Sequence, residues 1–284
     1  MHRSGTSAIA RGIFSLGVYL GNDFLDAQPE NPTGYWEDRN LVALDDRVLE
    51  SFGLRWDGIG RIDPREFESR KVRKLQREAA SYCHKRLASR PLWGFKDPRA
   101  IRVLPFWQNV LRDCGAQGSY VVAIRHPRSI AASLFARQGM LSDDAYRLWL
   151  VHMVPFLHTI APAPFVVIDY DLLMQEPRRE LARMGCTLEL EAGGAEADRF
   201  VAEFLNPSLR HSSFSPDDLE HATPAARLTK TAYAQLFALA QDRLDPRDFW
   251  RSWREIEVQV AALIPAADPS RDRPFSLKRW FSRP

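Results

Sequence analysis

Apolar positions recur at helical spacing through the first part of the chain. Within residues 5–19 they lie three or four positions apart behind a start of serine, glycine and threonine, which predicts a helix. The same spacing predicts a second helix over residues 38–52, with Gly53 just past its end. Residues 65–89 predict a third helix, in which charged positions dominate and face solvent.

Three later segments carry the short apolar runs typical of strands. They are residues 92–96, 119–125 and 165–170. In the second and third, β-branched residues dominate an almost continuous apolar run, as in the buried strands of parallel sheets. Helical patterns lie between the strands, and the chain after about residue 177 is mostly helical. This alternation predicts an α/β fold, a three-layer sandwich with a central parallel sheet.

Charged residues stand where the three predicted strands end. Lys96 closes the first strand, Arg125 the second, and Asp169 lies at the end of the third. Parallel sheets bind ligands beyond the carboxyl ends of their strands. We therefore expect the functional site at this edge of the sheet.

Composition narrows the class of protein. Hydrophobic residues make up 45% and charged residues 26% of the 284 positions, ordinary values for a globular protein. We expect one domain over residues 1–264, followed by a flexible, basic tail over residues 265–284. The formal net charge of +3 is too small to predict a nucleic-acid partner.

The spacing of the cysteines and the hydropathy of the chain indicate in which cellular compartment the protein is expected. Cys83, Cys114 and Cys186 lie far apart, which argues against a disulfide framework or a zinc site and favours a reducing compartment. No apolar run approaches the roughly 18 residues that a membrane span needs, and the chain lacks a signal-peptide pattern at its start. The expectation is a cytoplasmic protein without a transmembrane segment.

A short polar segment, Arg3–Ser7, comes directly before the first predicted helix. Gly5 permits a tight turn, and the hydroxyls of Ser4, Thr6 and Ser7 join the free N–H groups of a helix start, which binds phosphate or sulfate. A capped helix at a chain end uses the same residue types. The P-loop kinase pattern is not met, because Thr6 stands where that pattern has lysine.

This segment resembles the 5′-phosphosulfate loop of sulfotransferases that use 3′-phosphoadenosine 5′-phosphosulfate (PAPS). Bacterial members often have Gly-Met-His-Arg-Ser-Gly-Thr-Ser, and residues 1–7 match that string from its second residue. The resemblance implies a P-loop-NTPase-like sulfotransferase fold. In the family a buried strand precedes the loop, so for a chain that begins at Met1 we expect the first strand to be missing and Arg3 to lie on a frayed end. An upstream true start or a truncated product would each explain this.

A second motif combines Arg125 with Ser133, eight positions later on the following helix. An arginine at a strand end can fork onto a phosphate, and a serine two turns into the helix faces the same side. The pair resembles the 3′-phosphate motif of the same family, which implies that both residues hold that phosphate. The alternative is a plain helix start at His126-Pro127 with Ser133 in solvent.

A third segment, Gly94–Arg99, ends the first predicted strand with Lys-Asp-Pro. It resembles the segment that several sulfotransferase subfamilies place beside the transferring group. The resemblance implies that Lys96 neutralises the bridging oxygen, together with Arg3 at the loop. The alternative is a surface turn, since Asp-Pro often begins one.

Residues 31–38 join two aromatic rings to two carboxylates. Such a loop suits an acceptor pocket, with Tyr35 and Trp36 as a platform and an acid that takes a proton. The resemblance implies Glu37 as the base, with Asp38 as its competitor, although Asp38 looks more like the N-cap of the next helix. The alternative is that both rings belong to the hydrophobic core.

Two weaker similarities lie downstream. Tyr170–Leu173 resembles the family's Tyr-Glu-Asp-Leu segment, and Arg210 stands where members carry a basic residue near the nucleotide. The alternatives are a strand-to-helix junction and an exposed basic residue.

The resemblance implies an enzyme that transfers a sulfuryl group from PAPS to a hydroxyl acceptor, with PAP as product. An in-line displacement is expected, without a metal. The acceptor is a small molecule or a glycan or lipid-linked group, with a carbohydrate hydroxyl as first choice. The alternatives are a P-loop nucleotide kinase that needs ATP and magnesium, and a non-catalytic relative that binds PAP or a glycan. The sequence does not determine the oligomeric state.

Overall fold

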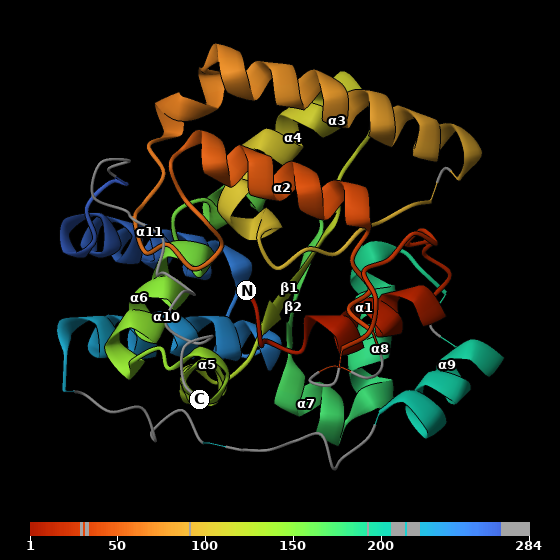
Figure 1. Ribbon diagram of the computed structural model, residues 1–284. Coiled ribbons are helices and arrows are strands. Elements are labelled where there is room, and N and C mark those ends of the chain that lie inside the picture. The colour runs from red at the N-terminus through yellow and green to blue at the C-terminus, as the bar shows by residue number, and fades with distance from the viewer. Residues whose placement is uncertain are drawn as a thin grey trace, which may run out of the picture.

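The computed structural model describes residues 1–28, 31, 34–90, 92–191, 193–205, 214 and 222–267. Helices surround one short pair of strands (Figure 1). The first elements are α1 (Thr6–Ser15), α2 (Arg39–Ser51), η1 (Pro64–Glu68), α3 (Arg70–Ser89), η2 (Ala100–Val103), α4 (Leu104–Asp113), β1 (Tyr120–Ile124), α5 (Pro127–Gln138) and α6 (Ser142–Met153). Then follow η3 (Leu157–Ile160), β2 (Phe165–Asp169), α7 (Tyr170–Gln175), α8 (Pro177–Leu188), α9 (Ala195–Arg199), the π-helical η4 (Phe200–Phe204), α10 (Pro224–Ala240) and α11 (Pro246–Leu263).

The strands β1 and β2 pair in parallel, with Ile124 opposite Asp169 at their carboxyl ends. A parallel pair needs a long crossover, which here contains α5 and α6. Because the two strands end level with each other, the next residues, Arg125 and Tyr170, leave the sheet at the same edge. The predicted mixed α/β class and the parallel pairing of these two segments are confirmed.

The first predicted strand, residues 92–96, is wrong as a strand. Only Trp93 forms a bridge, in parallel with Tyr19, and the N–H of Gly94 donates to the Tyr19 carbonyl at 3.0 Å. An extended segment becomes a strand only where a neighbour supplies a ladder of hydrogen bonds. Apolar composition alone does not provide that neighbour.

The predicted charged helix over residues 65–89 is divided in two. Ser69 has an extended backbone (ψ 148°) between η1 and α3, and its hydroxyl accepts from the N–H of Val72. Asp63 caps η1 in the same way through the N–H of Arg65. The two caps explain why one pattern of apolar positions gives two elements.

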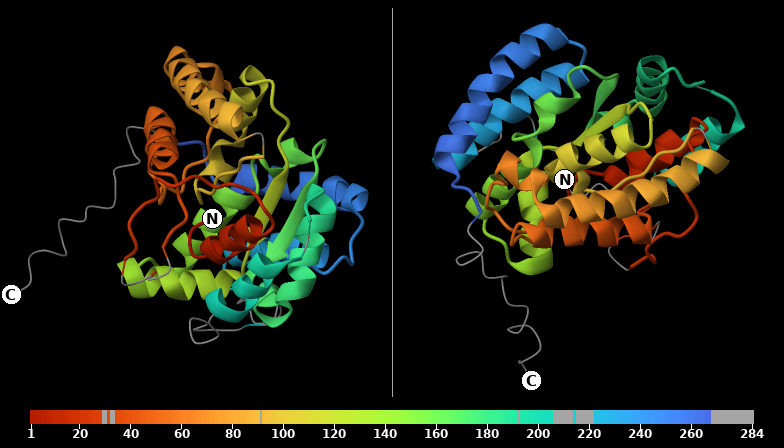
Figure 2. Two further views of the ribbon diagram at one scale, coloured as in Figure 1. Left: turned by 90° about the vertical axis from the view of Figure 1, so that its right-hand side faces the viewer. Right: turned by 90° about the horizontal axis from the view of Figure 1, so that it is seen from above.

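Two hydrophobic clusters cover opposite faces of the strand pair. Val122 and Ile124 belong to a large cluster that includes residues of α6, α10 and α11. Val166 and Ile168 belong to a second cluster with residues of α1 and α8. Figure 1 shows α1 and α8 on one side of the strands and α6 and α10 on the other. In Figure 2, α10 and α11 lie side by side, and α3 packs against both α2 and α4.

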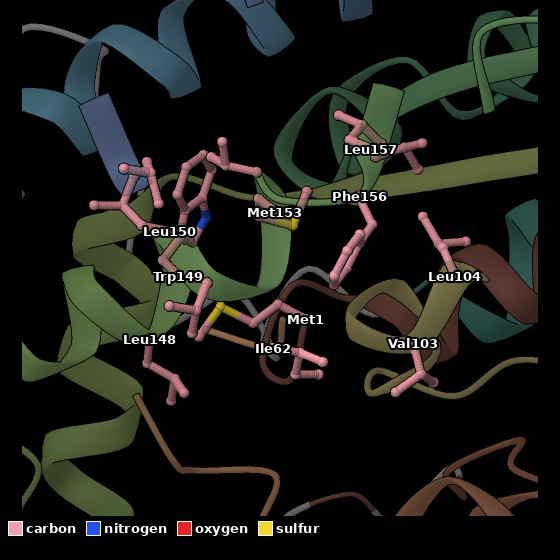
Figure 3. Packing of buried hydrophobic residues seen from close by; sticks show 14 of the residues in the cluster. Met1, Ile62, Val103, Leu104, Leu148, Trp149, Leu150, Met153, Phe156 and Leu157 are labelled. Carbon is pink, nitrogen blue, oxygen red and sulfur yellow. The ribbon is translucent and has the colours of Figure 1, made fainter. Parts of the chain in front are cut away.

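The first residues of the chain are packed, so the expected frayed end is wrong. Met1 is 4% exposed and belongs to the large cluster, where Figure 3 shows it together with Ile62, Met153 and Phe156. The His2 ring lies 4.5 Å from that of Trp56. These contacts fix the chain immediately before the Arg3–Ser7 segment.

Candidate functional site

The turn before α1 leaves the helix start open. Arg3 and Gly5 both have left-handed backbones, with φ of 65° and 72°. Gly5 is the N-cap, and none of the described side chains caps the helix. The first helical bond runs from the N–H of Ile9 to the Gly5 carbonyl. The N–H groups of Thr6 and Ser7 therefore have no acceptor within the described part of the chain. Such an end attracts an anion through its donors and its dipole.

The Ser4 hydroxyl adds a second unsatisfied group to this turn. Ser4 is 1% exposed, and its Oγ has no hydrogen-bond partner among the residues that the structure describes. A buried hydroxyl without a partner costs about 1 to 3 kcal/mol, which a bound oxyanion would recover. Together with the open helix start, it makes the turn fit a phosphate or sulfate group.

The second predicted motif meets this turn directly. Arg3 Nε donates to the hydroxyl of Ser133 on α5 at 2.7 Å, across 130 positions of sequence. A serine hydroxyl that accepts one hydrogen bond still has its own proton to donate. The fold thus brings together the two segments that the sequence marked as anion-binding.

Arg125 lies partly buried at the end of β1, with its guanidinium 4.7 Å from the centre of the Tyr170 ring. Its Nε is buried without a hydrogen-bond partner, and no carboxylate pairs with it among the described residues. Buried or partly buried arginines are normally paired. Because the aromatic ring contacts the guanidinium without accepting a hydrogen bond from it, the N–H donors of Arg125 can bind a ligand.

Glu37 and Lys96 form the closest charged pair of the site. Lys96 Nζ donates to Glu37 Oε1 at 2.5 Å and to the Tyr35 carbonyl at 2.9 Å. Burial raises the pKa of the Glu37 carboxyl above its ordinary value, and the Lys96 charge opposes this rise. Burial likewise lowers the pKa of Lys96, against the pull of Glu37. The third ammonium proton has no acceptor within the described residues.

Arg99 closes the Gly94–Arg99 segment, and the sequence pattern predicted no role for it. Its Nη1 donates to both Asp97 oxygens at 2.8 Å, and its Nε lies 2.8 Å from Asp46 Oδ1. The same Nη1 is 3.8 Å from Glu37 Oε2. Arg99 therefore compensates the carboxylates around Glu37, and its position at the end of the Lys-Asp-Pro segment was the only available signal.

The loop before α2 is tied to the first turn of α1. The Ser7 hydroxyl donates to the Tyr35 carbonyl at 3.2 Å and accepts from the Asn31 amide at 3.3 Å. Because the Tyr35 carbonyl also accepts from Lys96, the loop connects the turn to the charged pair.

Trp36 is partly buried and packs against the second hydrophobic cluster. Its backbone is left-handed, with φ of 58°, and its ring centre lies 5.6 Å from that of Phe14 and 5.4 Å from that of Phe24. Phe204 adds an edge contact at 6.3 Å. The hydrophobic surface of this tryptophan is used in packing.

Asp38 acts as the N-cap of α2, as expected from the sequence. One of its oxygens accepts from the N–H groups of Asn40 and Leu41, and the other accepts from the Tyr82 hydroxyl at 2.6 Å. A carboxylate with both oxygens occupied in this way is a weaker candidate for a base than Glu37.

One predicted site residue cannot be placed relative to the turn and the charged pair. Arg210 lies outside the described residues. A hollow of about 620 Å³ is lined by Phe165, Arg183 and Asp242, among others, near the amino-terminal end of β2, and contains none of the predicted site residues. Within the described residues, no group of three or more His, Cys, Asp or Glu side chains could hold a metal ion, and no helix is long and apolar enough to cross a membrane.

Comparisons with protein-family models, curated proteins and solved structures give no match to this chain.

Gly5→Ala is expected to destabilise the protein by about 2 to 4 kcal/mol. The left-handed backbone disfavours any side chain, and a Cβ at Gly5 would overlap the ring of Tyr170. Chemical denaturation measures the change. Gly139→Ala is the matched control, because Gly139 has φ of 70° and nothing within 4 Å of an added Cβ. Equal losses in the two variants would contradict the predicted overlap.

Asp169→Asn is expected to remove a pH dependence of stability. Asp169 is 1% exposed, and burial raises the pKa of its carboxyl to about 7. The folded state therefore keeps a proton that the unfolded state releases from about pH 4 upward. The free energy of unfolding of the wild type falls as pH rises from about 4 to about 7, by on the order of 4 kcal/mol, and then levels off.

The asparagine amide oxygen can still accept from the backbone N–H groups of Asp171 and Leu172, which now bond to Asp169. We expect the variant to be more stable than the wild type at pH 8, with the difference vanishing toward pH 4. Thermal unfolding between these values checks it, with the exposed Asp113→Asn as control. Parallel pH profiles for wild type and Asp169→Asn would refute the prediction.

Proposed function

We propose that this protein is a sulfotransferase that transfers a sulfuryl group from PAPS to a hydroxyl acceptor. The observation that carries the proposal is the hydrogen bond from Arg3 to Ser133. It joins the open helix start, which suits one anion, to α5, the helix that follows Arg125. Arg125 has no carboxylate partner in the described chain and suits a second anion. A nucleotide with phosphate at both its 5′ and 3′ positions matches two adjacent anion sites.

The proposed nucleotide contacts divide between these two sites. The N–H groups at Gly5, Thr6 and Ser7 and the Ser4 hydroxyl bind the 5′-phosphosulfate. Arg125 and Ser133 bind the 3′-phosphate, which distinguishes PAPS from ATP. The Ser4 hydroxyl and the Nε of Arg125, neither of which has a hydrogen-bond partner among the described residues, both fit such a ligand. Arg210 is kept as a nucleotide contact on the resemblance alone.

Glu37 is proposed as the base of the transfer step. It takes the proton of the acceptor hydroxyl while the acceptor oxygen bonds to sulfur. Lys96 and Arg3 neutralise the charge that develops on the bridging oxygen as the old S–O bond breaks and PAP leaves. The pairing of Glu37 with Lys96 supports this division, because both groups already lie in one buried site.

The proposal includes the type of fold to which the parallel strand pair belongs. A P-loop-like sulfotransferase fold has helices on both faces of a parallel sheet. The two clusters on the faces of β1 and β2 support that arrangement. The acceptor is proposed to be a carbohydrate hydroxyl, for which Tyr35 is left as the candidate ring, since Trp36 is used in packing.

A transfer assay with PAPS and a panel of sugars, phenols and lipid-linked alcohols, followed by mass spectrometry, tests the proposal. Sulfated product is the expected result. Product only with ATP and magnesium would instead indicate a kinase, for which Thr6 replaces the usual lysine. Binding of PAP without transfer would indicate a non-catalytic relative.

A further inference from the structure

Tyr170 is the residue at which both anion-binding elements meet. It follows β2 directly, begins α7 and is 8% exposed. Its ring packs against the turn before α1, since a Cβ at Gly5 would overlap its Cδ2 and Cγ atoms. The ring also lies 4.7 Å from the Arg125 guanidinium. One side chain therefore contacts the open helix start and the strand-end arginine.

An aromatic partner suits Arg125 better than an acid would if the arginine binds a phosphate. A carboxylate would use up the guanidinium donors and cancel the charge. A ring attracts the cation through its quadrupole and leaves the N–H groups available. Because no described residue pairs with Arg125 through a hydrogen bond or an ion pair, the ring is the contact that holds its orientation.

Tyr170 is itself held firmly. Asp169, the residue before it, caps α7 through the N–H groups of Asp171 and Leu172. The other oxygen of Asp169 accepts from the hydroxyl of Tyr233, a buried residue of α10. The strand end, the cap and α10 thus restrict where the Tyr170 ring can lie.

We propose that Tyr170 is a positioning residue that aligns Arg125 with the Arg3–Ser7 turn, so that both phosphates of one nucleotide are bound together. This inference rests on the proposed function. It predicts that the ring contributes to the preference for a 3′-phosphate and not only to stability.

The experiment compares PAP with AMP, which lacks the 3′-phosphate, by calorimetry. In Tyr170→Leu, the ratio of the AMP to the PAP dissociation constant is expected to fall about fivefold, the effect of losing one cation–π contact. Tyr170→Phe keeps the ring and should keep the wild-type ratio. In an Arg125→Ala background, Tyr170→Leu should change the ratio no further, because the group that the ring positions is gone.

A purely structural role would weaken both nucleotides equally and leave the ratio unchanged, which would overturn the inference. A Tyr170→Leu effect that persists without Arg125 would overturn it as well. If the wild-type protein binds neither PAP nor AMP, the proposed function itself fails. If it binds PAP and Tyr170→Leu keeps the wild-type ratio, only the role of Tyr170 fails.

Discussion

Glu37→Gln is expected to slow the proposed sulfuryl transfer by about a hundred- to ten-thousand-fold, the usual contribution of a general base. Glutamine fills the same space, and its carbonyl oxygen can accept the hydrogen bond from Lys96 that Glu37 now accepts. It cannot take the acceptor proton. PAP affinity should therefore change little while turnover collapses. Steady-state rates with saturating PAPS, together with PAP calorimetry, measure the two effects separately.

Asp38→Asn is the matched control for this substitution. An asparagine oxygen can still cap α2 at the N–H groups of Asn40 and Leu41. Turnover within a few-fold of wild type is expected, because an N-cap has no part in the proton transfer. Collapse in Asp38→Asn, with near-normal turnover in Glu37→Gln, would assign the base to Asp38.

Arg125→Ala is expected to weaken PAP binding about 10- to 100-fold, the range of one or two charge-assisted hydrogen bonds. AMP affinity should hardly change, because AMP lacks the 3′-phosphate. The loss of stability should be small, since the guanidinium has no ion-pair partner among the described residues and only its ring contact is removed. Calorimetry with both nucleotides and thermal unfolding check these effects.

Arg112→Ala removes the same charge from an exposed position on α4 and serves as the control for non-specific electrostatics. Equal weakening of PAP in both variants would show that only the net charge matters. Unchanged PAP affinity in Arg125→Ala would remove Arg125 from the nucleotide site.

Local patterns in the sequence were enough for many of the elements. The spacing of apolar positions and the capping residues predicted α1 and α2, and Asp38 was correctly chosen as a cap. The β-branched runs predicted β1 and β2 and their parallel pairing. These features depend on residues close together in the chain, because helix caps and amphipathic spacing act within a few positions.

Other outcomes depended on partners far away in sequence. Within the described part of the chain, residues 92–96 form one bridge, to Tyr19, instead of a ladder of hydrogen bonds with a neighbouring strand. Trp36 packs beside Phe14, Phe24 and Phe204, a use that composition did not distinguish from an acceptor platform. Arg99 acquired its role only through the carboxylates that the fold brings to it.

The turn at Arg3–Ser7 illustrates which features the sequence determined and which depended on the tertiary structure. By itself the sequence determined the residue types for an anion site: a glycine for the left-handed turn, hydroxyls, and an arginine beside them. Only the tertiary structure decided that Ser133 and Tyr170 meet this turn and that Met1 anchors it in the core. The physical reason is that backbone conformation and free helix donors are local properties, whereas contacts between distant residues depend on how strands and helices pack.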